Sequence, residues 1–166
     1  PDELVCGPAR PKLAVDCDRL AAKGQPPARE IHNCSGKHTG FLTLCQHQSW
    51  SRATYHHRDH PAQQRFAAAL LSLSGCSSND LIWGVDGCGL PTPSLPVEAM
   101  ARAMSDYAAP DTGTLRGQAQ ARLVEAVAEE TWFIAGTDDF SVALARETGG
   151  RIVAKVGAAG YFMAVI

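Results

Sequence analysis

The spacing of apolar residues changes from a helical period to a strand-like one towards the end of the chain, and this change constrains the fold most. Residues 61–74 begin with proline, end before Gly75, and carry apolar side chains at helical spacing. Residues 151–155 and 161–166 are instead short apolar runs joined by a glycine-containing turn, which is typical of a β-hairpin. Helices followed by a hairpin predict an α+β fold.

The rest of the chain shows further helical patterns and no sign of a domain boundary. There is no internal repeat, low-complexity run or linker, so residues 1–166 are predicted to form a single domain. The apolar run 81–85 predicts a strand, and the proline-rich residues 90–96 predict a rigid irregular segment. Further helices are predicted at residues 13–22, 34–48, 112–130 and 138–147, with another that begins at Pro96.

Composition and charge exclude several classes of protein. The net charge is -2, so no basic stripe is available to neutralise the phosphates of a nucleic acid. No run approaches the ~18 apolar residues that cross a bilayer, which excludes a membrane span. Six cysteines without compact disulfide spacing favour free or metal-bound thiols and a cytoplasmic location. Because the chain lacks an initiator methionine and ends on a strand-like segment, it is interpreted as an incomplete part of a longer domain.

A first group of reactive side chains lies at the predicted start of the helix at 34–48. Cys34 and Lys37 are three residues apart and would share one helical face, and His38 follows directly. The positive end of a helix dipole lowers the pKa of a nearby thiol, so Cys34 is expected to be reactive or metal-binding. An ordinary helix cap would show the same spacing, and the spacing alone leaves both interpretations open.

A second group follows the predicted strand at 81–85. Asp86 and Cys88 alternate with glycines there, at a strand end where functional loops are common. Together with Cys34 and Lys37, Cys88 could complete a three-ligand zinc site, because thiolate is a preferred zinc ligand. A tight turn with a buried thiol remains the alternative.

A third candidate, Lys155, has a less specific sequence pattern around it. Lys155 stands near the end of a predicted strand and precedes Gly157 by two residues, which partly matches the lysine box of serine β-lactamase-like enzymes. Surface lysines before turns are common, so this match has little meaning by itself.

Taken in order along the chain, these motifs resemble the L-asparaginase II family, the bacterial class related to the rhizobial inducible asparaginase. The resemblance implies a serine β-lactamase-like fold and hydrolysis of L-asparagine to L-aspartate and ammonia. It also implies serine–lysine pairs, a zinc ion and a homodimer in the full-length enzyme. The motifs are His32 to His38, Tyr55 with His60-Pro61-x-Gln63, Asp86-Gly87-Cys88-Gly89-x-Pro91, and Lys155-x-Gly157-Ala158-x-Gly160.

Carried over position by position, the resemblance implies a zinc site with substrate beside it. Cys34, Lys37 and Cys88 would be the zinc ligands. Asp86 would orient metal-bound water, and His38 would lie beside the substrate. Zinc would help to bind and orient the substrate rather than supply the nucleophile.

The resemblance also implies a catalytic lysine and shows two departures from the family. Lys155 would accept the proton of a serine, whereas the nucleophilic serines would lie upstream of Pro1. The isolated chain is therefore expected to show little or no activity. Ala159 stands where the family has glutamate, and Asp138 stands where it has arginine after Gly136-Thr137.

Two alternatives to the zinc-dependent amidohydrolase remain. Cys34 and Lys37 have the spacing of a Ser-x-x-Lys pair, so Cys34 could be a thiol nucleophile with Lys37 as its base. The changes at Asp138 and Ala159 would fit a metal-binding module that has lost catalysis.

Overall fold

The computed structural model describes residues 1–136 and 138–166 of the chain. Contacts between Cα atoms divide it into two compact units, Pro1–Pro96 and Val97–Ile166, and each is described by itself. The single domain expected from the sequence stays a prediction. Thr137, which belongs to the segment that departs from the family, lies outside the described residues. Among the described helices, none has the length and apolar character required to cross a membrane.

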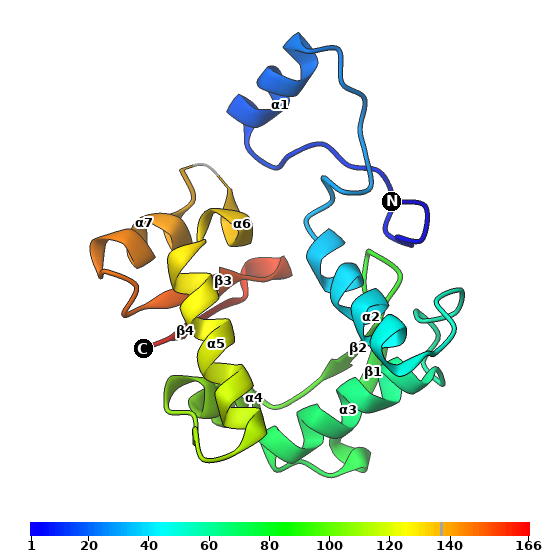
Figure 1. The fold of residues 1–166 in the computed structure, drawn as a ribbon, viewed down its shortest axis with the longest axis vertical. Helices are drawn as coiled ribbons and strands as arrows, with labels where there is room; N and C mark the ends of the chain where they lie inside the picture. Colours follow the sequence, from blue (N-terminus) through cyan, green and yellow to red (C-terminus); the bar gives the residue numbers. More distant parts are fainter. Residues whose placement is uncertain (137) are drawn as a thin grey trace. The chain divides into compact units, whose positions relative to one another are not determined.

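The first unit contains three α-helices and a small antiparallel hairpin (Figure 1). The helices predicted at 13–22, 34–48 and 61–74 and the strand at 81–85 are confirmed to within one residue at each end. The strands pair from Ile82 with Ser94 to Val85 with Pro91. The elements are α1 (Ala14–Ala22), α2 (Ser35–Gln48), α3 (Pro61–Ser74), the 3-10 turn Ser78–Asp80, β1 (Ile82–Val85) and β2 (Pro91–Ser94).

Helix α3 shows why its bounds follow from the sequence. Its first residue, Pro61, has the backbone angle that a helix start requires and lacks an N–H group that would need a partner. His60 caps the helix, because its Nδ1 accepts the Ala62 N–H at 3.1 Å. Gly75 ends the helix at a φ of 71°, in the left-handed region that favours glycine.

Strand β2 corrects the expectation of an irregular segment at 90–96. Pro91 and Pro93 both lie inside this strand, although proline cannot donate a hydrogen bond to a sheet. Being two residues apart, they face the same edge, and β1 pairs only with the other edge. Proline is therefore tolerated because β2 is an edge strand of a two-stranded sheet.

The core of the first unit brings α2, the segment before α3 and the hairpin together. Cys45 of α2 and Tyr55 are fully buried, as is Cys6 near the start of the chain. Cys88 and Leu90, from the loop between the strands, pack in the same cluster. This core holds the start of α2 against the loop that follows β1.

The second unit consists of helices and a terminal hairpin, and the hairpin predicted at 151–166 is confirmed. Its strands pair from Val153 with Val165 to Val156 with Phe162. The short helix α6 was not predicted, because four residues are too few to show a period. The chain as a whole is of the α+β class. The elements are α4 (Val97–Ala108), α5 (Leu115–Glu129), α6 (Trp132–Ala135), α7 (Phe140–Glu147), β3 (Val153–Val156), the 3-10 turn Ala158–Gly160 and β4 (Phe162–Val165).

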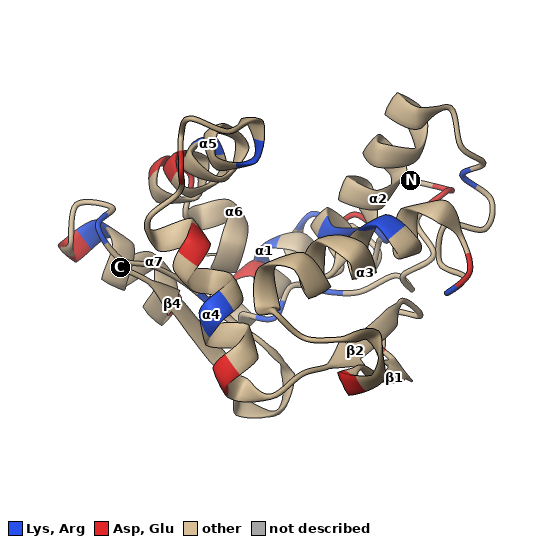
Figure 2. Ribbon diagram, turned by 90° about the horizontal axis from the view of Figure 1, so that it is seen from below, with Lys and Arg blue, Asp and Glu red and all other residues tan. Residues whose placement is uncertain are grey.

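Charged residues of both signs are interspersed along the elements of each unit (Figure 2). On α4, Arg102 pairs with Glu98 at 2.9 Å, and on α1 Arg19 pairs with Asp16 at 3.2 Å. Both pairs are one helical turn apart and lie at the surface, so each adds only a few tenths of a kcal/mol to stability.

Candidate metal centre

The start of α2 is organised by a histidine that the sequence analysis left without a role. Cys34 is the N-cap residue, and its backbone N–H donates to Nδ1 of His32 at 2.9 Å. The Ser35 N–H donates to the His32 carbonyl at 2.8 Å. His32 therefore fixes the backbone turn that presents the half-buried Cys34 thiol. The signal in the sequence is a side-chain acceptor two residues before a helix start.

The loop after β1 is held in a tight turn by its own backbone. The Asp86 N–H donates to the Leu90 carbonyl at 2.8 Å, and the Gly89 N–H donates to the Asp86 carbonyl at 2.8 Å. Gly89 has a φ of 87°, which a residue with a side chain rarely adopts. The turn buries Cys88 to 4% exposure in the core. Asp86 stays half-buried at the surface of the same turn.

These two segments bring four side chains together. The sulfurs of Cys34 and Cys88 and a carboxylate oxygen of Asp86 all lie within 4.8 Å of one another. The Lys37 ammonium forms an ion pair and hydrogen bond with Oδ2 of Asp86. The three predicted ligands and Asp86 thus meet, although more than forty residues separate the two segments in the sequence.

The donor set fits a zinc ion. Two thiolates bound to one tetrahedral zinc lie about 3.8 Å apart, given Zn–S bonds of about 2.3 Å. The two sulfurs here lie within 4.8 Å of each other, a separation compatible with a shared zinc ion. The Lys37 amine is tied to Asp86 beside them. A shift of the amine from the carboxylate to the metal would leave Asp86 next to the site as a hydrogen-bond acceptor.

The protonation of the cluster differs from what the helix start alone suggests. Burial raises the pKa of the Cys34 thiol, and Cys88 raises it further, so the expectation that the helix start lowers this pKa is wrong. Burial by itself would lower the pKa of Lys37, but Asp86 and the thiols outweigh it and raise that pKa. The hydrogen bond from Lys37 lowers the pKa of Asp86. The cluster therefore holds a neutral Cys34 thiol and a Lys37–Asp86 ion pair.

His38 lies next to this cluster in a fully buried position. Its Nδ1 is 2.6 Å from the hydroxyl oxygen of Tyr55, which also accepts the Val5 N–H at 3.0 Å. Its Nε2 has no hydrogen-bond partner among the described residues. Burial, followed by the charge of Lys37, lowers the pKa of His38 and favours the neutral imidazole.

The comparison with known protein families agrees with the motifs at this centre. The family model described as L-asparaginase II matches residues 1–166, the entire chain. The chain belongs to the L-asparaginase II family. A search of curated proteins found no significant match. Membership indicates an amidohydrolase of the asparaginase kind, which acts on an amide such as asparagine.

The other residues singled out in this asparaginase-family chain lie in the second unit. Lys155 is exposed on β3, and its Nζ donates to the Val156 carbonyl at 2.8 Å. Its relation to the metal centre stays a prediction. Ala159 and Asp138, which depart from the family, are both exposed and have φ values of 55° and 57°.

Cys6 is a residue near the centre that the sequence analysis did not single out. It is fully buried in the same core as Cys88. Burial and then Cys88 raise the pKa of its thiol, which donates to the Arg29 carbonyl oxygen at 3.7 Å. Cys6 therefore serves as a small core residue that packs behind the centre. The six cysteines, all of which the structure describes, form no disulfide.

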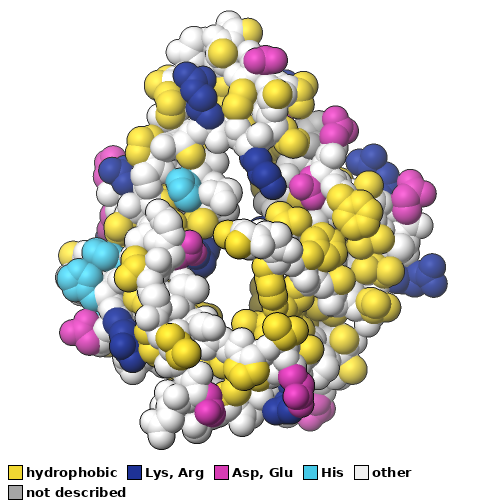
Figure 3. All heavy atoms as spheres, turned by 180° about the vertical axis from the view of Figure 1, so that it is seen from behind, with side chains coloured by type: hydrophobic (Ala, Val, Ile, Leu, Met, Phe, Trp, Pro, Cys, Tyr) yellow, Lys and Arg dark blue, Asp and Glu magenta, His cyan; other side chains and the backbone are white. Residues whose placement is uncertain are grey.

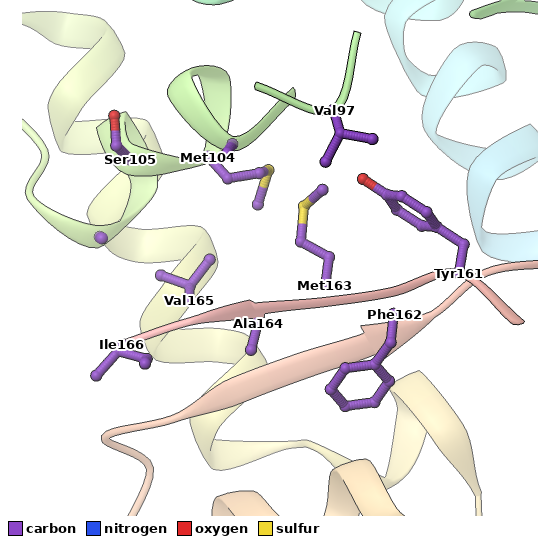
Figure 4. A pocket seen from close by; sticks show the side chains of 11 residues that line it. Val97, Met104, Ser105, Tyr161, Phe162, Met163, Ala164, Val165 and Ile166 are labelled. Carbon is purple, nitrogen blue, oxygen red and sulfur yellow. The ribbon is translucent and has the colours of Figure 1, made fainter. Parts of the chain in front are cut away.

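The second unit contains an apolar hollow of about 430 Å³ between α4 and β4 (Figure 4). Met104 and Met163 point into it, and Tyr161 lies at one end with its hydroxyl towards Val97. No charged residue lines it. Further apolar side chains gather on the visible face of this unit (Figure 3). Its lining residues offer neither a nucleophile paired with a base nor a metal ligand set.

Proposed function

We propose that the chain contributes the zinc centre of an enzyme that hydrolyses L-asparagine to L-aspartate and ammonia. The observation that carries the proposal is the convergence of Cys34, Cys88 and Asp86 within 4.8 Å, with Lys37 bonded to the carboxylate. Membership in the L-asparaginase II family is the reason for proposing an amide substrate. The proposal assigns Cys34, Lys37 and Cys88 as the ligands.

The protein groups have distinct tasks in this proposal. When bound, zinc would supply a fixed positive charge that orients the substrate. Lys37 must lose its proton before its amine can bind, and the adjacent Asp86 carboxylate is placed to take that proton towards solvent. Freed from Lys37, Asp86 can accept a hydrogen bond from a water molecule or from the substrate amide. His38 is proposed to lie beside that substrate.

The remaining steps belong to groups whose arrangement is proposed from the family resemblance. Lys155 would accept the proton of a nucleophilic serine, and the serines would lie upstream of Pro1 in a serine β-lactamase-like fold. A homodimer and a cytoplasmic location are proposed on the same ground. We expect no detectable release of ammonia from L-asparagine by the 166-residue chain, and turnover by a longer chain that includes the upstream serines. Robust turnover by the shorter chain would contradict the upstream placement.

Metal analysis with matched variants tests the ligand assignment. We expect the purified chain to bind about one zinc ion, measured by elemental analysis and by titration with a chromogenic chelator. Cys34→Ser and Cys88→Ser should each weaken zinc binding by at least tenfold, because each removes a thiolate ligand. Lys37→Arg should weaken it as much, because arginine keeps its proton and cannot bind the metal. Cys17→Ser, which changes a half-buried thiol on α1, is the control and should bind zinc normally.

One pattern of results would reassign the third ligand. If Lys37→Arg bound zinc normally and Asp86→Asn did not, the carboxylate would be the ligand and Lys37 its ion-pair partner. A wild-type chain that bound no zinc at micromolar concentrations would contradict the zinc centre itself.

The thiol-hydrolase alternative has less support from the contacts. Lys37 donates to Asp86 and is held in its protonated form, so it is not placed as a base for Cys34. Burial keeps the Cys34 thiol neutral. Under the zinc proposal, zinc should protect Cys34 from alkylation by iodoacetamide. Alkylation at an unchanged rate in the presence of zinc would favour the thiol hydrolase.

A further inference from the structure

His38 and Tyr55 form a buried pair beside the metal centre, and the proposed zinc chemistry does not require this pairing. Both side chains are fully buried, and their rings meet edge to face with centroids 5.7 Å apart. The Tyr55 hydroxyl oxygen lies 2.6 Å from Nδ1 of His38. The other ring nitrogen of His38, Nε2, is a buried polar atom without a hydrogen-bond partner among the described residues.

The hydrogen bonds around Tyr55 decide which nitrogen of His38 carries the proton. The Tyr55 oxygen accepts the Val5 N–H at 3.0 Å, so one of its acceptor positions is occupied. Its own hydrogen needs an acceptor, because a buried hydroxyl without one is unfavourable. The acceptor that the structure places within reach is Nδ1 of His38. A neutral imidazole that accepts at Nδ1 carries its hydrogen at Nε2.

We propose that Tyr55 is a positioning residue that holds His38 as the Nε2–H tautomer, so that Nε2 donates a hydrogen bond to an oxygen of the amide substrate. The identity of this acceptor rests on the proposed function. L-Asparagine offers suitable oxygens in its carboxylate and its amide carbonyl, and the product L-aspartate offers two carboxylates. The Nε2 atom is covered, so neighbouring side chains must move to admit the oxygen.

This arrangement would contribute to specificity. A fixed N–H donor in a buried position favours an oxygen and disfavours an amino group, because a donor that faces another donor leaves both unpaired. The position suits a substrate contact, since His38 follows the proposed ligand Lys37 on α2 and lies close enough for the charges of Lys37 and Asp86 to act on its ring.

Nitrogen NMR of the 166-residue chain with labelled histidine rings tests the proposal directly. We expect a protonated Nε2 and an unprotonated Nδ1 for His38 in the wild type, with the signals assigned by their loss in His38→Gln. Tyr55→Phe removes the hydroxyl and should shift His38 towards the Nδ1–H tautomer. Tyr107→Phe, on α4 in the second unit, is the matched control and should leave the spectrum unchanged.

Titration with L-aspartate, followed by the same signals and by calorimetry, tests the substrate contact. We expect the Nε2 signal to move on binding, and Tyr55→Phe to weaken binding about tenfold or more. An Nδ1–H tautomer in the wild type would overturn the proposal, and so would an Nε2–H tautomer that Tyr55→Phe leaves unchanged. The wild-type measurement stands even if the variant fails to fold. An unmoved Nε2 signal in the presence of bound L-aspartate would also overturn it. A Tyr55-dependent tautomer without any binding of L-aspartate or L-asparagine would support the positioning and refute the substrate contact, whereas the proposed function is decided by the metal analysis and by turnover of the longer chain.

Discussion

Ala159 occupies a backbone conformation that costs free energy for any residue with a β-carbon. Its φ and ψ are 55° and 30°, in the left-handed region, within the short 3-10 turn between β3 and β4. The cost of this conformation is about 1–2 kcal/mol for an ordinary L-residue and near zero for glycine. Ala159 also stands where the family resemblance places glutamate, so the strain is not specific to alanine.

We predict that Ala159→Gly stabilises the chain by about 1 kcal/mol, because glycine adopts this conformation without strain while losing more freedom on folding. Urea unfolding followed by circular dichroism measures the change. Ala158→Gly, at the neighbouring position without a positive φ, is the control and should not stabilise. A stability gain of equal size at both positions would contradict the explanation.

His56 makes stability depend on pH in a direction that can be worked out. Burial, followed by the neighbouring His57 and His60, lowers the pKa of His56 below its ordinary value. Its Nδ1 is buried without a hydrogen-bond partner among the described residues. Below about pH 6.5 the unfolded chain therefore binds a proton at His56 that the folded chain resists. The stability present above that pH is lost as the pH falls towards the lowered folded-state pKa.

We predict that His56→Asn loses less stability than the wild type between about pH 7.5 and about pH 5.5. The measurement is the free energy of unfolding in urea at both pH values. His47→Asn, which changes an exposed histidine on α2, is the control and should follow the wild type. A wild-type pH dependence that His56→Asn leaves unchanged would show that other groups cause it.

Among the secondary-structure elements, α5 depends on a glycine for reasons that helix propensity does not contain. A β-carbon at Gly117 would lie 1.9 Å from the Asp111 carbonyl oxygen, so the preceding turn would have to move. The same glycine donates its N–H at 3.0 Å to the hydroxyl of the N-cap residue Thr114. The turn before α5 therefore packs directly against the helix and leaves no room for a side chain.

We predict that Gly117→Ala destabilises the chain by about 2 kcal/mol or more, although alanine is the better helix former. Gly40→Ala in α2 is the matched comparison, because its backbone is helical and a β-carbon added there would have nothing within 4 Å. That variant should gain up to about 1 kcal/mol. Thermal or urea unfolding of both variants measures the contrast, and a gain in both would refute the packing argument.

Across the entire chain, the two compact units differ in what they contribute. All three proposed zinc ligands and Asp86 belong to the unit Pro1–Pro96, whereas Lys155 belongs to Val97–Ile166. A ligand that binds only the folded state stabilises the part that it binds by mass action. Zinc is therefore expected to act first on α2 and the loop after β1.

We predict that zinc slows amide hydrogen exchange in α2 and in the β1–β2 loop. At about 100 times its dissociation constant, zinc should raise the free energy of opening there by up to about 2.7 kcal/mol. Exchange in α5 and α7 should change much less. Cys88→Ser should abolish the effect in both units. Equal slowing in both units of the wild type would show that they open as one cooperative structure.

Much of the local structure follows from short-range rules that the sequence displays. The bounds of α3 were predicted from Pro61 and Gly75, because capping and breaking are properties of a residue and its immediate neighbours. The short helix α6 and the strand β2 were missed because their own residues show no such local signal. Four residues show no period, and the prolines of β2 are tolerated only because that strand lies at a sheet edge, which the sequence does not reveal.

The amino-acid sequence alone established the α+β class, most helix bounds, the terminal hairpin, and the candidates Cys34, Lys37, Asp86 and Cys88. The three-dimensional fold was needed to show that these side chains meet, because packing between distant segments placed them within reach of one another. It was also needed for the protonation of Cys34, since burial by residues far along the chain outweighs the local helix dipole. Long-range burial and pairing set the chemistry of the centre, and no short stretch of sequence contains them.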